Sequence, residues 1–338
     1  MDHLYKTVFL VVFSLFSTTI STANVNITTT PVVHDLAIIG SGIAGLTAAI
    51  TAANSRLHNI IVFEGERPGG LLLGVQNVIN WPGTLIGHGP TIISTMQEHA
   101  EKLGVKFSTD SITSISLDQR PFVMTTEQGD SIQAHTIIIA TGSDYKKLGC
   151  PGEEFYLGKG IAICTLCDGP LFAGKRVAVI GSNNIAFEKA LYMTRFTPDI
   201  RIIFASPEPH ASPALVTKAR QRNIKIIPNT RVLDILGNEN HVTHMTLSEN
   251  GTHYSMEIDG IVIAIGLVPN TAVIPDAVHR TETGHISCNR LAETNIPGIF
   301  VAGTVCNGEY IQALPAAAGG FTAAAQAEKY LAKLRKIK

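Results

Sequence analysis

The sequence has almost no excess of charge of either sign. Its 338 residues include 26 Lys and Arg against 27 Asp and Glu, which gives a formal net charge of −1 at pH 7. Without a basic excess the chain lacks the electrostatic footprint of nucleic-acid binding, so we expect no nucleic-acid partner. Charged residues account for 16% and apolar residues for 45%, which is typical of a globular protein, and the length allows two ordinary domains.

Long apolar runs are lacking too, even at the N-terminus. The run Val8–Phe16 is too short to cross a bilayer easily, and Ser21, Thr22 and Ala23 behind it form a small-x-small cleavage pattern. This arrangement predicts a signal peptide over residues 1–23 and a leader over 24–32. The mature protein is then exported, to the periplasm, the secretory pathway or the extracellular space. The alternative is an uncleaved membrane anchor.

The cysteines do not form an even set. The five are Cys150, Cys164, Cys167, Cys288 and Cys306, and an odd count argues against a purely structural disulfide framework. The Cys-x-x-Cys pair, Cys164 and Cys167, fits a zinc half-site, an inert disulfide or a redox-active dithiol. A zinc site would need a second ligand pair at suitable spacing, so we expect no metal. We favour the redox-active dithiol, with the adjacent Asp168 as its acid–base partner.

A nucleotide-binding turn is present near residue 40. An apolar strand over Asp35–Ile39 leads into Gly-x-Gly-x-x-Gly at residues 40–45, and a helical pattern follows. Gly40 permits the tight turn, Gly42 lets backbone amides approach a pyrophosphate, and Gly45 allows the helix to pack closely on the strand. The next predicted strand, Ile60–Phe63, ends at Glu64, which is suitably placed to accept ribose hydroxyls.

Further motifs occur in a recognisable order along the chain. They are Gly69-Gly70-Leu71-Leu72, Asn80-Trp81-Pro82-Gly83, Ala140-Thr141-Gly142, Cys164-Thr165-Leu166-Cys167-Asp168-Gly169, the segment from Ala264 to Thr271, and Gln312-Ala313 before a helix rich in alanine and glycine. On these motifs the chain resembles the low-molecular-weight thioredoxin reductase family, class II of the FAD-dependent pyridine nucleotide-disulfide oxidoreductases. The resemblance covers nearly everything after the leader.

The resemblance implies an α/β fold with two Rossmann-like, three-layer nucleotide-binding domains. An FAD domain over 33–148 and 275–338 is interrupted by an inserted NAD(P)-type domain over 149–274, which carries the thiol pair. The family is a homodimer whose domains swivel, and the partner would be a thioredoxin-like protein or a small dithiol or disulfide. Cys167 would face the flavin, Cys164 would attack the external disulfide, and Asp168 would move the proton. The residues assigned to FAD are Gly40, Ser41, Gly42, Ala44, Gly45, Glu64, Gly70, Leu71, Asn80, Thr141, Gly142, Gly303, Thr304, Gln312 and Ala313.

The chain departs from the family where NADPH would bind. The second glycine turn, Gly181–Ala186, has Asn183 at the middle glycine position, where its side chain would crowd a pyrophosphate. We expect the turn itself to survive because asparagine tolerates left-handed backbone. The His-Arg-Arg that grips the 2′-phosphate is replaced by Phe204, Ala205 and Ser206. The loss of two charge-assisted hydrogen bonds would cost on the order of 3–6 kcal/mol of binding free energy. Glu208 is either a ligand for the ribose of NADH or a solvated loop charge.

The flavin domain also departs from the family pattern. Thr304 replaces the aspartate that holds the ribityl chain, Ile311 replaces an arginine, and Cys306 nearby is either a third redox thiol or a buried spectator. We therefore expect an FAD-dependent thiol–disulfide oxidoreductase that is not selective for NADPH, with the choice between NADPH and NADH open. The alternatives are a conventional NADPH-dependent thioredoxin reductase, a flavin-dependent dithiol oxidase and a non-catalytic flavoprotein.

Overall fold

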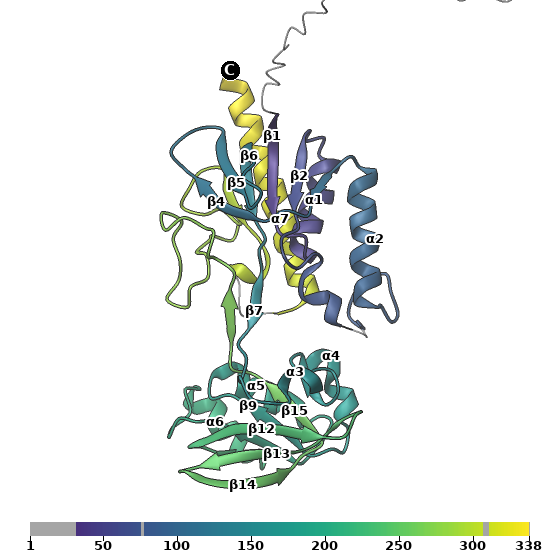
Figure 1. The fold of residues 1–338 in the computed structure, drawn as a ribbon, viewed down its shortest axis with the longest axis vertical. Coiled ribbons are helices and arrows are strands. Elements are labelled where there is room, and N and C mark those ends of the chain that lie inside the picture. The colour runs from purple at the N-terminus through teal and green to yellow at the C-terminus, as the bar shows by residue number, and fades with distance from the viewer. Residues whose placement is uncertain (1–31, 76–77, 307–310, 338) are drawn as a thin grey trace, which may run out of the picture. The chain divides into compact units, whose positions relative to one another are not determined.

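A mixed sheet forms the centre of the first domain. The computed structural model describes residues 32–75, 78–306 and 311–337, so the predicted signal peptide lies outside the described residues. The strand order is β3-β2-β1-β6-β5-β4, and β17 pairs with the C-terminal half of β6 (Figure 1). The parallel strands are β1 (Val33–Ile39), β2 (Ile60–Phe63), β3 (Lys106–Ser108), β6 (Ser131–Ile139) and β17 (Ile299–Val301), and the antiparallel ones are β4 (Ile112–Ser116) and β5 (Phe122–Thr126).

Helices cover one face of this sheet. They are α1 (Ile43–Asn54), α2 (Gly89–Lys102) and the long C-terminal α7 (Ala313–Ile337). Helix α7 lies against α1 so closely that a Cβ on Gly320 would be 2.2 Å from the Ala44 carbonyl oxygen. Small residues such as Ala48 and Ala324 fill this layer of the core, which explains why the sequence of α7 is rich in alanine and glycine.

The second domain has the same design around a parallel sheet. Its strand order is β11-β10-β9-β15-β8, with β8 (Ile161–Ala162), β9 (Val177–Ile180), β10 (Ile200–Ile203), β11 (Lys225–Ile227) and β15 (Gly260–Ile263). Helices α5 (Asn184–Met193) and α6 (Pro213–Gln221) pack on one face. An antiparallel sheet of β12 (Thr230–Gly237), β13 (Val242–Glu249) and β14 (Thr252–Glu257) packs on the other. The predicted α/β class and the paired Rossmann-like domains are confirmed.

An antiparallel ribbon marks where the chain passes between the domains. Strand β7 (Ser143–Tyr145) leads out of the first domain, and β16 (Leu267–Pro269) pairs with it on the return. Beyond the ribbon, Leu148 packs against the core of the second domain and Ile274 belongs to the core of the first. The second domain is thus inserted into the first, while the predicted boundaries at 148/149 and 274/275 stay predictions.

Short helical turns carry the segments around the thiol pair and the flavin motifs. They are η1 (Gly70–Gly74), α3 (Glu153–Tyr156), α4 (Thr165–Asp168), η2 (Gly169–Phe172) and η3 (Gly303–Val305). Among the described residues, no helix is both long and apolar enough to pass through a membrane.

Candidate active site

The first glycine turn is built for close backbone approach. Gly40 has φ +111°, and a Cβ there would lie 2.3 Å from the Ala140 carbonyl oxygen. A Cβ on Gly45 would lie 1.8 Å from the Gly40 carbonyl oxygen. Within the described part of the chain, no side chain caps α1 at Gly42 and its first turn holds no acidic residue. The N-terminal amides of α1 are therefore available to an anion.

A second glycine segment completes the phosphate cradle. Ser41 is buried, and its Oγ accepts a hydrogen bond from the Gly69 amide at 3.0 Å. This bond holds the Gly69–Gly70 segment against the turn, and a Cβ on Gly70 would lie 3.2 Å from Gly42 Cα. The Ser41 hydroxyl accepts in this bond, so its own proton is still available to a ligand. Leu71 follows in η1, which begins at Gly70. These residues fit the pyrophosphate of a dinucleotide such as FAD.

Glu64 lies where a ribose-binding carboxylate is expected. It directly follows β2, and its amide donates to the Ser108 carbonyl oxygen at 2.9 Å. Burial, and secondarily the nearby Glu101, raises the pKa of the Glu64 carboxyl. A hydroxyl donor from a ligand would stabilise the ionised form of this buried carboxylate.

The remaining flavin motifs interlock across the sequence. Thr141 Oγ1 donates to the backbone carbonyl oxygen of Asn270 at 2.6 Å, and the backbone amide of Asn270 donates to the Gly142 carbonyl oxygen at 3.0 Å. Ser143 Oγ donates to the Thr304 carbonyl oxygen at 2.8 Å. A Cβ on Gly142 would lie 3.6 Å from Thr304 Oγ1, and one on Gly303 would lie 2.9 Å from Ala44 Cβ. The motifs at 141–142 and 303–304 thus lie beside the first glycine turn and its helix.

Gln312 connects a flavin motif to the thiol pair. Its Oε1 accepts from Asn80 Nδ2 at 2.8 Å, and its Nε2 donates to Cys164 Sγ at 3.3 Å. Cys164 is disulfide-bonded. Ala313, next to Gln312, begins α7. The side chain of Cys167 lies outside the described atoms, so its predicted contact with the flavin stays a prediction.

Asp168 lies in a half-buried position beside the thiol pair. Its amide donates to the Cys164 carbonyl oxygen at 2.9 Å, which closes the turn α4. Burial raises the pKa of the Asp168 carboxyl. Burial, with a smaller contribution from Asp168, raises the pKa of Tyr145 to about 12, so Tyr145 stays protonated at neutral pH. A raised pKa makes the Asp168 carboxyl a better proton acceptor beside the thiol pair.

Lys189 is a residue of this site that the motifs did not reveal. It lies on α5, and its Nζ donates to the Ile163 carbonyl oxygen at 2.6 Å, one residue before Cys164. Burial lowers the pKa of the Lys189 ammonium to about 8. A lysine in a helix that also carries Glu188 reads as a surface charge, so a sequence signal for its burial was missing. The contact makes Lys189 a positioning residue for the Cys164 segment.

The second glycine turn has its polar groups already paired. Asn183 is the N-cap of α5, and its Oδ1 accepts from the Ala186 amide at 3.0 Å. Ser182 Oγ is hydrogen-bonded to His210 Nδ1 at 3.0 Å, and Asn184 Oδ1 accepts from the Ser212 amide at 2.7 Å. The turn survives, as expected, although Asn183 has extended backbone, with φ −87° and ψ 176°, and does not use the left-handed conformation that asparagine tolerates. An N-cap residue normally adopts extended backbone, and Gly42 does the same in the first turn.

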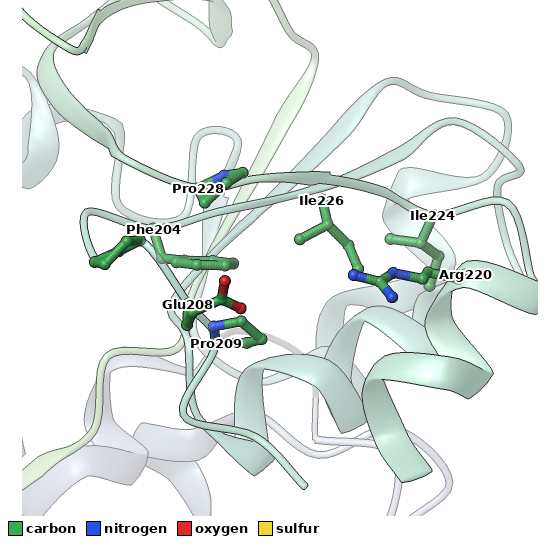
Figure 2. A pocket seen from close by; sticks show the side chains of 8 residues that line it. Phe204, Glu208, Pro209, Arg220, Ile224, Ile226 and Pro228 are labelled. Atoms are coloured by element: carbon green, nitrogen blue, oxygen red, sulfur yellow. The ribbon is translucent and has the colours of Figure 1, made fainter. Parts of the chain in front are cut away.

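A pocket lies at the end of β10, where the 2′-phosphate-binding arginines of the family would follow. It encloses about 330 Å³ and is lined by Phe204, Pro207, Glu208, Pro209, Arg220, Ile224, Ile226 and Pro228. Figure 2 shows the Glu208 carboxylate below the Phe204 ring, and Arg220 lies beside Ile224 and Ile226. Arg220 comes from α6, so motif comparison at 204–206 could not find it. One carboxylate and one guanidinium therefore face the same small pocket.

Comparison with known proteins agrees with this geometry. A model of the family "pyridine nucleotide-disulphide oxidoreductase" matches residues 34–326. Thioredoxin reductase of Coxiella burnetii is 38% identical over 315 residues, covering 89% of this chain and 97% of that protein. The bifunctional thioredoxin reductase/thioredoxin of Mycobacterium leprae is 35% identical, covering 89% of this chain and 66% of that protein. The solved thioredoxin reductase from Giardia duodenalis has a TM-score of 0.84 at 30% identity, covering 89% of this chain and 99% of that one.

These similarities extend over both domains, and the glycine cradle fits the dinucleotide that the family binds. FAD and a nicotinamide nucleotide are the cofactors of such enzymes. The chain therefore belongs to the pyridine nucleotide-disulphide oxidoreductase family, as an FAD-dependent oxidoreductase of the thioredoxin reductase type that acts on sulfur groups.

Proposed function

We propose that this enzyme exchanges electrons between bound FAD and the Cys164/Cys167 pair, and that the pair acts on the disulfide of a thioredoxin-like protein or a small disulfide. The observation that carries the proposal is the 3.3 Å hydrogen bond from Gln312 to Cys164 Sγ. This bond brings the disulfide-bonded sulfur of Cys164 next to Gln312, which belongs to a flavin motif. The relative from Mycobacterium leprae is named as a thioredoxin reductase and a thioredoxin in one chain, which supports a thioredoxin-like partner.

The residues divide the work by their chemistry. The thiolate of Cys164 attacks the substrate disulfide and forms a mixed disulfide. The thiolate of Cys167 then displaces the substrate thiolate, which leaves the enzyme pair oxidised and the substrate reduced. Asp168, whose pKa is raised by burial, exchanges a proton with the thiols, and Lys189 fixes the backbone before Cys164. FAD, when bound, supplies the two-electron couple that restores the dithiol.

Turnover of a disulfide substrate tests this assignment. Cys164→Ser should abolish reduction of both oxidised thioredoxin and a small aromatic disulfide, because the attacking sulfur is gone. Cys150→Ser is the matched control, since Cys150 is a free thiol that packs in the core of the second domain. Persistent turnover in Cys164→Ser would refute the mechanism. Because the relatives are named as reductases, a dithiol oxidase and a non-catalytic flavoprotein are less favoured alternatives.

We further propose that NADPH is not the preferred electron donor. Two features support this: Asn183 occupies an amide of α5 that a pyrophosphate would take, and the loop at His210 and Ser212 engages the neighbouring polar groups. Positions 205 and 206, where the family has its arginines, carry Ala205 and Ser206. Ser206 Oγ instead donates to the Glu208 carbonyl oxygen at 2.8 Å. Glu208 in the pocket at β10 favours NADH as the second candidate, because a carboxylate accepts ribose hydroxyls and repels a 2′-phosphate.

Restoring the missing guanidinium groups tests donor choice. The double variant Ala205→Arg with Ser206→Arg should bind NADPH roughly 10²- to 10⁴-fold more tightly, since each charge-assisted bond is worth roughly 1.5–3 kcal/mol. Affinity for NADH should change little, so NADH titration is the control. Micromolar NADPH affinity in the unaltered enzyme would contradict the proposal. In Arg220→Leu, the change in nucleotide affinity measures how much the Arg220 guanidinium contributes to binding.

We also propose that the enzyme is exported and dimeric. Support for export comes from the apolar run and cleavage pattern before residue 24. The intact mass of the protein from its producing cells should correspond to a chain beginning at Asn24. Support for a homodimer comes from the family and from exposed apolar side chains, with Leu85 at 96% and Ile86 at 71% exposure. Sedimentation equilibrium should then give twice the chain mass.

A further inference from the structure

A second pair of cysteines meets outside the Cys-x-x-Cys motif. The Ile286 amide donates to the Val305 carbonyl oxygen at 2.9 Å, so the segment leading to Cys288 lies beside the end of η3, next to Cys306. This geometry brings the two thiols near each other, and each thiol shifts the pKa of the other. Both are free, as is Cys150 elsewhere in the described part of the chain.

The two thiols differ in their access to solvent. Cys288 is exposed, whereas Cys306 is half-buried and packs against the first-domain core that contains Ile139 and Ile286. Cys306 is also fixed by its backbone, because its amide and its Sγ both hydrogen-bond to the Gly303 carbonyl oxygen, at 3.2 and 3.4 Å. The Cys288 sulfur is thus accessible to solvent, whereas the Cys306 sulfur is held in place.

The surroundings give the two sulfurs different acidities. The interaction with Cys306 lowers the pKa of the Cys288 thiol to about 7, which favours its thiolate form. The interaction with Cys288, and secondarily burial, raises the pKa of Cys306 and favours its protonated form. An exposed thiolate is the form that oxidants attack, and a neighbouring thiol is what resolves the product.

We propose that Cys288 and Cys306 form a second, reversible dithiol–disulfide couple that is oxidised by peroxides. The Cys288 thiolate attacks one oxygen of the peroxide, the O–O bond breaks, and sulfenic acid forms with release of hydroxide or an alkoxide. Cys306 then attacks the Cys288 sulfur, the S–O bond breaks, and water leaves with the thiol proton. The dithiol has lost two electrons to the peroxide, and an external dithiol returns them by exchange.

The couple lies at a place where oxidation can reach the flavin site. Gly303 and Thr304 in η3 belong to the flavin motif of the family, and the Cys306 backbone amide donates a hydrogen bond to the Gly303 carbonyl oxygen. A disulfide would tie the segment at Ile286–Cys288 covalently to η3. We therefore expect the flavin fluorescence of the holoenzyme to shift when the couple is oxidised.

Peptide mapping of the full-length holoenzyme tests the couple directly. The enzyme is treated with increasing hydrogen peroxide, blocked with N-ethylmaleimide and digested with trypsin without reductant. Cleavage after Arg280, Arg290 and Lys329 places Cys288 in peptide 281–290 and Cys306 in peptide 291–329. We expect these two peptides to become linked, at a peroxide concentration at least tenfold below that which oxidises Cys150. Dithiothreitol should separate them again.

Variants assign the two roles and separate this couple from the Cys-x-x-Cys pair. In Cys306→Ser, dimedone should label Cys288 as sulfenic acid, because no thiol remains to resolve it. In Cys288→Ser, labelling of Cys306 should be at least tenfold weaker than the labelling of Cys288 in Cys306→Ser. The double variant Cys164→Ser with Cys167→Ser should still link the two peptides, so the result does not depend on the proposed function. Equal oxidation of Cys150 and Cys288, or linkage of either peptide to another cysteine, would overturn the proposal. The unaltered protein supplies this answer even if a variant fails to fold.

Discussion

At the residue scale, the contacts of the site depend on side chains whose roles a motif does not specify. Ser41 is predicted to contact the cofactor, and its hydroxyl also accepts from Gly69 and so holds the cradle together. Asn183 was expected to crowd a pyrophosphate, and its side chain caps α5. A motif gives the residue type at a position, whereas the partner of a short polar side chain depends on which backbone the fold brings within reach.

Lys189 provides a prediction at this scale. The folded protein lowers its pKa from 10.5 to about 8 by burial, so between these values the unfolded chain binds a proton that the folded chain has released. Stability must therefore rise with pH in this window, and below pH 8 the cost of burying the charge is present in full. The stability of the unaltered protein relative to Lys189→Met should increase by up to about 3 kcal/mol from pH 8 to 10.5. Urea unfolding at intervals of pH measures this, and parallel pH profiles for the two proteins would rule it out.

At the scale of elements, the strand–turn–helix units could be predicted and their covering layers could not. The apolar strand and glycine pattern at 35–45 predicted β1, the turn and α1, because a buried parallel strand and a phosphate turn each leave a local signature. The antiparallel sheet β12–β14 has no such motif. The pairing of Thr141 with Asn270 joins positions 129 residues apart, so it depends on the insertion and the ribbon of β7 and β16.

The first glycine turn predicts a sharp contrast between two substitutions. Gly45→Ala would place a Cβ 1.8 Å from the Gly40 carbonyl oxygen, so the turn and α1 must move apart and flavin should be lost. Gly74→Ala is the matched control, because a Cβ there would meet no described atom within 4 Å and its φ is not positive. The ratio of flavin to protein absorbance after purification measures occupancy. Equal occupancy in the two variants would show that the turn does not hold the cofactor.

The N-terminus of α5 supports a second prediction at the scale of elements. Asn183→Gly removes the side-chain acceptor from the Ala186 amide and leaves only its bond to the carbonyl oxygen of residue 183, at 3.1 Å. Replacing an Asn cap by Gly costs only a few tenths of a kcal/mol of stability. Affinity for both NADH and NADPH should therefore rise while the melting temperature changes little. Isothermal titration calorimetry measures the affinities. Unchanged affinity for both nucleotides would mean that the cap does not compete with a ligand.

At the scale of the whole molecule, two nucleotide-binding domains of one design have diverged in what they retain. The first keeps open helix amides, a glycine cradle and a buried carboxylate at Glu64. The second keeps the fold, but its turn is capped by its own side chains and its strand end lacks the arginines. The chain's family follows from both domains together, whereas its electron donor depends on the details of the second.

The exchange of electrons between thiols and flavin is the central claim, and one measurement tests it most directly. The purified holoenzyme is titrated with reduced dithiol in the absence of oxygen while the absorbance of oxidised flavin is followed. We predict stoichiometric loss of the yellow flavin absorbance in the unaltered enzyme and in Cys150→Ser, and none in Cys167→Ser. Bleaching that proceeds equally well in Cys167→Ser would contradict the account.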